Sequence, residues 1–230
     1  DGLRRDGLRR EVPPGHVAER ARYVCSDRDP AFRCSPITVM QWADTPVDVA
    51  TKVYFDLETS GLRPDRGARI TEIAVVGSRG TRMNWQWADV ETERPVGGDC
   101  YDQTVPPHLA HLTDVLKRGV VIGHNLSFDF DFLTYEIERL RKRADPDVAA
   151  LRKGVGLRVR FVDTLGLARR LVDVSSYELG ALLEHFGASP EEPLHTALVD
   201  AFATRALFAR LTDHPEISTL ADAGLQKLAW

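Results

Sequence analysis

From residue 51 onward, apolar residues recur in short runs separated by turn-forming residues, a pattern typical of strands in a packed sheet. These runs lie at 52–58, 69–77, 82–87, 120–125 and 158–164. The second and third runs are separated by the short polar segment 78–81, which predicts a turn and therefore a hairpin. The pattern predicts five strands.

After the third run, the segments between and beyond the remaining runs have apolar positions with the period of a helix. Residues 106–118 predict a short helix opened by Pro106 and Pro107. Residues 127–143 predict a longer one that Ser127 can cap. Its apolar stripe consists of Phe128, Phe132, Ile137 and Leu140.

Two more helices are predicted toward the C-terminus. Residues 175–187 have Ser175 and Glu178 at the spacing of a capping box, and Gly187 as a stop. A strong helix follows over His195–Leu211, and a weaker helix is expected in a C-terminal helical tail at 213–230. Strands that form a meander and then alternate with helices predict an α/β fold with a mixed β-sheet flanked by helices.

Residues 1–50 have a different character. They open with the tandem repeat DGLRRDGLRR and continue with proline-punctuated polar text. Such text rarely packs, so we expect a loosely structured N-terminal extension, which is a candidate for binding a protein partner. The packed domain is expected over 51–212.

Composition narrows the class of protein. The chain of 230 residues is 43% hydrophobic and 28% charged, and no apolar run approaches the ~20 residues that span a bilayer. Three cysteines (Cys25, Cys34 and Cys100) without metal-site spacing favour a reducing, cytoplasmic compartment. The Arg-rich N-terminus lacks the apolar region of a secretory signal, and a first residue other than Met suggests a processed chain or a fragment. The net charge of −4 means that any nucleic-acid binding must use local basic patches or metal ions.

The first predicted strand carries two acids where a buried strand should be apolar. Asp56 and Glu58 are two residues apart and therefore point to the same face. Two carboxylates so close repel each other unless a cation lies between them or one is protonated. An exposed edge strand with solvated acids is the alternative.

Three later residues change that balance. Asp129 falls in the first turn of the helix that follows a buried strand. His195 and Asp200 are five residues apart, about 140° around a helix, so they cannot share a helix face. We therefore expect Asp200 to project from the helix and His195 to lie at or before its first turn.

Together, these five residues resemble the motifs of the DEDDh family of 3′–5′ exonucleases, which includes the proofreading epsilon subunit of bacterial DNA polymerase III, ribonuclease T and oligoribonuclease. FDLETSGL is similar to the first motif, HNLSFDFDFL to the second and HTALVD to the third. The resemblance covers about residues 51–212 and implies a ribonuclease-H-like fold. It also implies a two-metal hydrolase that releases nucleoside monophosphates from 3′ ends.

The resemblance assigns roles to the catalytic residues. Asp56 would bridge two divalent ions, Mg²⁺ or Mn²⁺. Glu58 and Asp200 would complete the first ion's site, and Asp129 would support the second. His195 would be the general base, a role that suits a side chain that titrates near neutrality. Hard divalent ions prefer such oxygen ligands.

The resemblance also predicts the residues that bind the terminal nucleotide. They are Leu57, Thr59, Ser60, Gly61, Leu62, His124, Asn125 and Phe128. Leu62 would wedge against the terminal base, whereas Phe128 could equally belong to the core. Asp163, in FVDT, is expected to be a structural hydrogen-bonding acid.

Basic residues crowd the segment from Arg139 to Arg160, either as a solvated surface or as a patch that guides a nucleic-acid backbone. The stretch 90–119 differs from the family text at that place, which leaves substrate choice open. We expect single-stranded DNA or frayed 3′ ends as substrate. An exoribonuclease is the alternative, and a non-catalytic nucleic-acid-binding module is a more remote one. The sequence does not indicate an oligomeric state.

Overall fold

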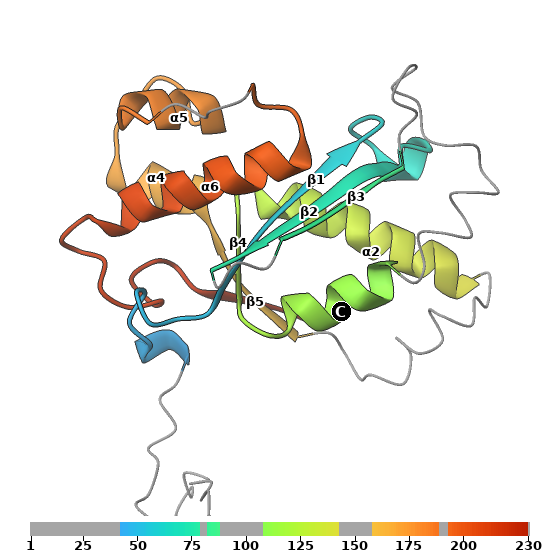
Figure 1. Cartoon of the computed structure of the whole chain (residues 1–230), viewed down its shortest axis with the longest axis horizontal. Helices are drawn as coiled ribbons and strands as arrows, with labels where there is room; N and C mark the ends of the chain where they lie inside the picture. The colour runs from blue at the N-terminus through green and yellow to red at the C-terminus, as the bar shows by residue number, and fades with distance from the viewer. Residues whose placement is uncertain (1–41, 79–81, 88–107, 143–157, 189–192, 230) are drawn as a thin grey trace, which may run out of the picture. The chain divides into compact units, whose positions relative to one another are not determined.

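The computed structural model describes residues 42–78, 82–87, 108–142, 158–188 and 193–229. A six-stranded sheet in the order β3-β2-β1-β4-β5-β6 runs through them (Figure 1). Its strands are β1 (Lys52–Thr59), β2 (Ile70–Gly77), β3 (Arg82–Gln86), β4 (Val120–Gly123), β5 (Arg158–Asp163) and β6 (Gln226–Ala229). The central pairs β1–β4 and β4–β5 are parallel, and the outer pairs are antiparallel.

Helices cover both faces of this sheet. They are α2 (Leu126–Lys142), α4 (Thr164–Leu171), α5 (Leu179–His185) and α6 (Ala197–Thr212), with short 3₁₀ turns η1 (Trp42–Asp44) and η2 (Pro64–Arg66). One core lies between the sheet and α2 with the helical segment 108–116, and the other between the sheet and α4, α5 and α6 (Figure 1). The predicted mixed sheet flanked by helices is confirmed. Among the described residues, no helix combines the length and hydropathy that a membrane crossing requires.

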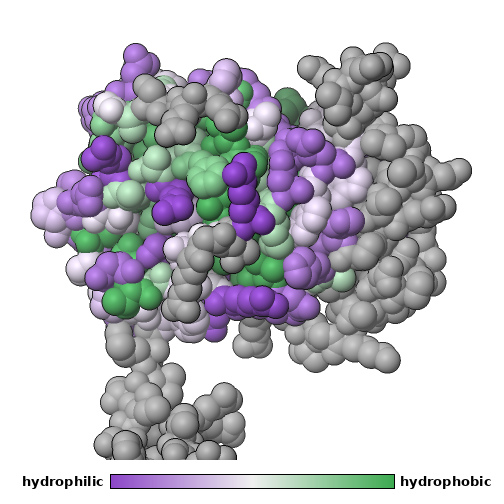
Figure 2. Space-filling view, in the orientation of Figure 1, coloured by the Kyte–Doolittle hydropathy of each residue, from purple (hydrophilic) through white to green (hydrophobic). Residues whose placement is uncertain are grey.

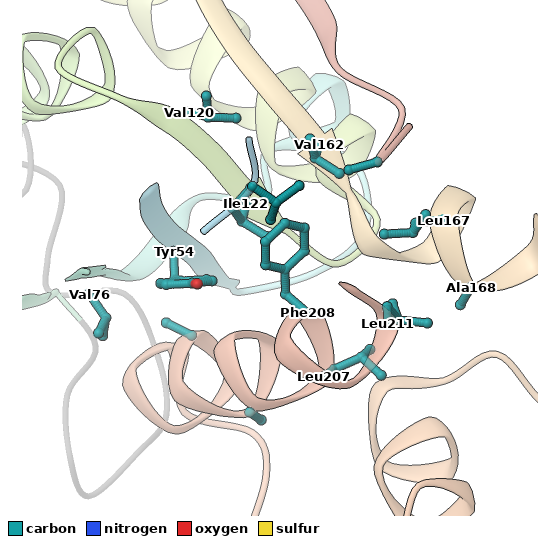
Figure 3. Close-up of a cluster of buried hydrophobic side chains, with 14 of the residues drawn as sticks. Tyr54, Val76, Val120, Ile122, Val162, Leu167, Ala168, Leu207, Phe208 and Leu211 are labelled. Atoms are coloured by element: carbon teal, nitrogen blue, oxygen red, sulfur yellow. The ribbon is translucent and has the colours of Figure 1, made fainter. Parts of the chain in front are cut away.

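The side chains of β1 alternate between the two cores. Val53, Phe55 and Leu57 pack on the α2 side, whereas Tyr54 packs on the α6 side. Figure 3 shows Tyr54 in this second core together with Phe208 of α6, and the two ring centroids are 6.3 Å apart. Alternation then places Asp56 and Glu58 on the α6 side, just beyond the apolar part of the strand.

The chain leaves β4 at a close approach that requires glycine. A Cβ on Gly123 would lie 2.2 Å from Cδ2 of Leu126 and 3.1 Å from the carbonyl oxygen of Phe55. The chain then passes through Asn125, whose φ of 66° is left-handed, into α2. Pairing between β4 and β1 stops at Tyr54 and Ile122, so the last residues of β1 have no β4 neighbour.

Two predicted helix caps are wrong. The helix α2 begins at Leu126, so Ser127 lies inside its first turn and donates to Oδ1 of Asn125. The helix α5 begins only at Leu179, with Glu178 as its N-cap, and no side chain caps it. The stop at Gly187 is confirmed by its left-handed φ of 64° just beyond that helix.

Two boundaries of the packed domain also differ from the prediction. Val47 and Ala50 are buried in the α6-side core, so the segment from Trp42 to Ala50 belongs to the folded domain and not to a loose extension. Residues 226–229 form β6 along the edge of β5, and not a helix, because that edge offers unpaired backbone groups. The rest of the predicted extension, with its role as a partner-binding segment, lies outside the described residues.

The surface of the described domain is of mixed polarity. On the face in Figure 2, hydrophilic and hydrophobic residues are interspersed over the helices and strands. Leu62, beside the end of β1, is among the large apolar side chains that are exposed.

Candidate active site

Three carboxylates meet where β1 passes under α6. Asp56 and Glu58 come from β1, and Asp200 comes from the first turn of α6. Oxygen atoms of the three groups lie within 4.8 Å of one another. The structure therefore brings together two predicted motifs that are more than a hundred residues apart in the sequence.

Asp129 reaches β1 from the opposite layer. It lies in the first turn of α2, is 4% exposed, and its Oδ1 accepts a hydrogen bond of 3.0 Å from the backbone N–H of Leu57. Because β4 has ended before this point, the side chain of Asp129 occupies the place that a neighbouring strand would take. It approaches the cluster from the other side of β1 and is not one of the three groups within 4.8 Å.

The carboxylates disfavour one another's ionisation. Burial raises the pKa of Asp56 well above its ordinary value, and the charges of Asp129, Asp200 and Glu58 raise it further. Burial, followed by the charge of Asp200, raises the pKa of Glu58 to about 7. Burial likewise raises the pKa values of Asp200 and Asp129. Without a cation, this site holds more negative charge than its surroundings stabilise.

Such a site fits divalent cations. Carboxylate oxygens are the ligands that Mg²⁺ and Mn²⁺ prefer, and three of them here lie close enough to share one ion. A bound cation would also favour the charged forms of Asp56, Glu58 and Asp200. The donor set and its electrostatics thus agree with the metal chemistry expected from the sequence.

His195 lies beside this cluster, two residues before α6 begins. Its side chain is exposed. A positive charge on it would offset part of the rise in the pKa values of Glu58 and Asp200. Its backbone N–H donates to Oδ1 of Asp200 over 3.3 Å. Its φ of 90° is unusual for a residue with a side chain, a form of strain that occurs at functional sites.

Thr196 explains why the helix starts immediately after the histidine. Its side chain accepts a hydrogen bond from the N–H of Val199 and so caps α6. The predicted positions are therefore confirmed: His195 precedes the helix, and Asp200 projects from its first turn.

The turn after β1 is held by its own polar groups. The hydroxyl of Thr59 donates to the carbonyl of Gly61, and the backbone N–H of Ser60 donates to the carbonyl of Arg69. The hydroxyl of Ser60 accepts from the N–H of Arg69 over 2.9 Å. The N–H of Leu57 is occupied by Asp129, so this group is not free for a nucleotide.

A groove runs beside this turn. It has a volume of about 410 Å³ and is lined by residues that include Leu62, Pro64, Phe128 and Tyr135. Leu62 is 81% exposed, whereas Phe128 is half-buried and stacks on Phe132 with ring centroids 5.0 Å apart. Phe128 therefore packs against the core and also lines the groove, and its contact with a nucleotide stays a prediction.

The segment after β4 is braced inside the protein. Both ring nitrogens of His124 have partners at 2.9 Å, the hydroxyl of Thr164 and the carbonyl of Tyr177. The N–H of Asn125 donates to Asp163, which also accepts from Leu165 and caps α4. Asp163 is thus a structural acid, as expected, and nucleotide contact by His124 and Asn125 stays a prediction.

Part of the basic segment is structural. Arg139 pairs with Glu136 over 2.8 Å, and its side chain is largely buried. The guanidinium of Arg160 lies over the ring of Trp42, 4.4 Å from its centre. Residues 143–157 lie outside the described residues, so the idea of a backbone-guiding patch rests on their sequence alone.

A fifth carboxylate next to the site was not predicted. Glu72 lies on β2 directly opposite Glu58 and is buried. Its signal in the sequence was a lone acid inside the apolar run RITEIAVVG. Glu72 lies outside the three motifs and was therefore not among the predicted site residues.

Comparison with known proteins agrees with this geometry. The family model RNase_T, described as Exonuclease, matches residues 98–208. The chain is 26% identical to the PolC-type DNA polymerase III of Thermotoga maritima over 208 residues, which are 83% of this chain and 14% of that protein. It is 30% identical to a DNA polymerase III subunit epsilon-like protein of Rhodobacter capsulatus, covering 74% of this chain and 25% of that protein. The chain thus spans a quarter or less of the length of these relatives.

A relative of more similar length is the DNA polymerase III subunit epsilon of Rickettsia felis. It is 29% identical over 177 residues, which are 70% of this chain and 73% of that protein. A solved structure of similar fold is the nuclease domain of 3′hExo, a DEDDh family member, bound to rAMP. Its TM-score is 0.51 at 16% identity, over 73% of this chain and 94% of that one. The family match, these relatives and the order of the site residues along the chain together support a DEDDh-type 3′–5′ exonuclease family.

Proposed function

We propose that this chain hydrolyses the terminal phosphodiester bond at the 3′ end of nucleic acid and releases nucleoside monophosphates. The observation that carries this proposal is the meeting of Asp56, Glu58 and Asp200, whose oxygens lie within 4.8 Å of one another, next to the exposed residue His195, whose backbone N–H donates to Asp200. A carboxylate cluster next to a base at the protein surface suits hydrolysis of a substrate that arrives from solution.

Two divalent ions bound here, Mg²⁺ or Mn²⁺, would activate water and offset the charge of the leaving oxygen. Asp56, Glu58 and Asp200 would hold the first ion. Asp56 and Asp129 would hold the second, on the side where Asp129 approaches β1. The hydrogen bond from Leu57 fixes one oxygen of Asp129 and so restricts the rotation of this side chain. Its other oxygen is then held in one orientation for the ion.

His195 takes the proton from the attacking water. Its backbone hydrogen bond to Asp200 holds the lead-in to α6 beside that carboxylate, while His195 remains exposed to solvent. The cap at Thr196 fixes the start of the helix that carries Asp200. One short segment therefore positions both the base and a metal ligand.

We assign the terminal nucleotide to the groove that follows the turn after β1, which is lined by Leu62 and Phe128 and by none of the four acids. Leu62 and Phe128 on its walls would contact the base. The turn at Thr59–Gly61, which directly precedes Leu62 in the chain, would lie along the sugar. We favour single-stranded DNA or frayed 3′ ends because the relatives described above are named as DNA polymerase III proteins. RNA is the second candidate, because the 3′hExo structure contains rAMP.

Single-stranded DNA and RNA oligonucleotides of matched sequence, labelled at the 5′ end, test this proposal. We expect a ladder that shortens from the 3′ end with Mg²⁺ or Mn²⁺, stops with EDTA and is absent for Asp56→Ala. A matched control is Asp213→Ala, an exposed acid at the other end of α6 and about 20 Å away along the helix. Binding without cleavage in either metal would contradict the proposal and favour a non-catalytic binding module.

A further inference from the structure

Glu72 is the buried acid that the proposed mechanism does not use. It is the one carboxylate in β2, a strand whose eight residues are all buried, and it is 6% exposed. Its Oε1 atom is buried and has no hydrogen-bond partner. Buried polar atoms in proteins nearly always have a partner, so this atom requires an explanation.

The side chain of Glu72 lies on the active-site face of the sheet. It is paired with Glu58 across the strands β1 and β2, and directly opposed residues share a face. Its neighbour Ala74, two residues along β2, belongs to the core under α6. The charge of Glu72 also contributes to the raised pKa values of Asp56, Glu58 and Asp200.

The pairing of Glu58 with Glu72 works against folding. Like charges directly opposite each other destabilise a sheet, and burial adds to that cost. No arginine or lysine among the described residues forms an ion pair with either glutamate. A cation that is not part of the chain would relieve both the repulsion and the missing contact of Oε1.

We propose that Glu72 is a positioning residue of the divalent-cation site and accepts a hydrogen bond from the hydration shell of the ion held by Asp56, Glu58 and Asp200. An indirect role is favoured because, among the described residues, Glu72 is not in the group whose oxygens lie within 4.8 Å of one another. Mg²⁺ and related ions keep several waters when proteins bind them, and such outer partners orient the ligands. The inference rests on the proposed function for its metal.

Titration calorimetry with Mn²⁺, in the absence of nucleic acid, tests this role without reference to activity. Wild type is compared with Glu72→Gln, which removes the charge at nearly constant shape, and with Glu72→Met, which also removes the acceptor. We expect Mn²⁺ affinity to fall about 10-fold or more for Glu72→Gln, and further for Glu72→Met. Exposed Glu184 supplies the control, since Glu184→Gln should bind Mn²⁺ as wild type does.

The metal-free melting temperature separates this role from a structural one. Glu72→Gln removes a repulsion, so its metal-free Tm should rise while its stabilisation by Mn²⁺ shrinks. Unchanged Mn²⁺ affinity in a folded variant, with or without a lower Tm, would overturn the inference. If wild type cleaves DNA and binds Mn²⁺, and Glu72→Gln binds Mn²⁺ equally well, only this inference is contradicted. Wild type that binds no Mn²⁺ removes the proposed function too.

Discussion

Two buried glutamates in this fold are treated in opposite ways. Glu136 on α2 is 1% exposed, and its two carboxylate oxygens meet Arg69 at 3.2 Å and Arg139 at 2.8 Å. Glu72 on β2 is 6% exposed and faces other acids instead of a cation. A charge that the chain itself neutralises serves the fold. A charge that the chain leaves unneutralised, in a cluster of similar charges, is set up for a ligand.

The neutralised cluster also supports the other one. Arg69, which pairs with Glu136, is bonded through its own backbone to Ser60 in the turn after β1. The ion pair thus ties that turn to α2, the helix that supplies Asp129. The structural acid holds in place the loop that is proposed to receive the substrate.

The largest expected effect comes from Asp56→Asn, which removes the central acid of the unneutralised cluster. Cleavage of labelled DNA should fall to background because both ions would lose a shared ligand. The metal-free Tm should rise, because a half-buried carboxylate whose pKa is raised well above its ordinary value is replaced by a neutral amide. Thermal unfolding with EDTA measures this. A lower metal-free Tm for Asp56→Asn would mean that the acidic cluster does not destabilise the metal-free fold.

His195→Asn should have the next largest effect. Loss of a general base typically costs about 10²- to 10⁴-fold in rate. Asparagine is chosen because it tolerates positive φ, so the backbone bond to Asp200 is retained. Single-turnover cleavage gives the rate, and Mn²⁺ titration should show unchanged affinity. Near-full activity would remove His195 from the mechanism.

Glu136→Gln should have the reverse effect of Asp56→Asn on folding. It leaves Arg69 and Arg139 without their carboxylate, and breaking a buried pair in this way costs about 3 kcal/mol, near the low end of the range because Arg69 is partly exposed. Urea unfolding in EDTA measures the loss. An unchanged free energy of unfolding would mean that the ion pairs of Glu136 do not stabilise the fold, contrary to the contrast drawn with Asp56.

The sequence predicts most acids of the unneutralised cluster, but it does not predict which buried acids the chain neutralises. The acids at 56, 58, 129 and 200 were found because each interrupts or follows an apolar run, and their order matches known motifs. Glu72 and Glu136 were not singled out, because a lone acid in an apolar segment gives no sign of its partner. Whether Arg69 faces Glu136 or Glu72 depends on how three separate elements pack.

The fold shows the same division. Five strands and the helices α2, α5 and α6 followed from periodicity, whereas α4 was not predicted. Capping by Ser127 and Ser175 was wrong because several nearby polar residues can start a helix. The tail was expected to be helical, but β5 has an open edge that the segment 226–229 covers. Local preference for a helix is weak beside pairing with an existing strand.

The smallest expected effect is a change in the pH dependence of the metal-free Tm. It tests whether the acids of the unneutralised cluster raise one another's pKa values. Glu58 has its pKa raised from 4.5 to about 7 in the folded protein. A carboxyl group whose pKa is higher in the folded protein than in the unfolded chain stabilises the fold at pH values below its pKa in the unfolded chain. This stabilisation is lost as the pH rises through its pKa in the folded protein. The metal-free Tm should therefore decline from about pH 5 to 7, and less steeply for Glu58→Gln. Mg²⁺ should reduce or reverse the slope, because a metal binds the deprotonated ligands. Identical slopes for wild type and Glu58→Gln in EDTA would mean that Glu58 titrates normally and that the acids of β1 do not form one charged cluster.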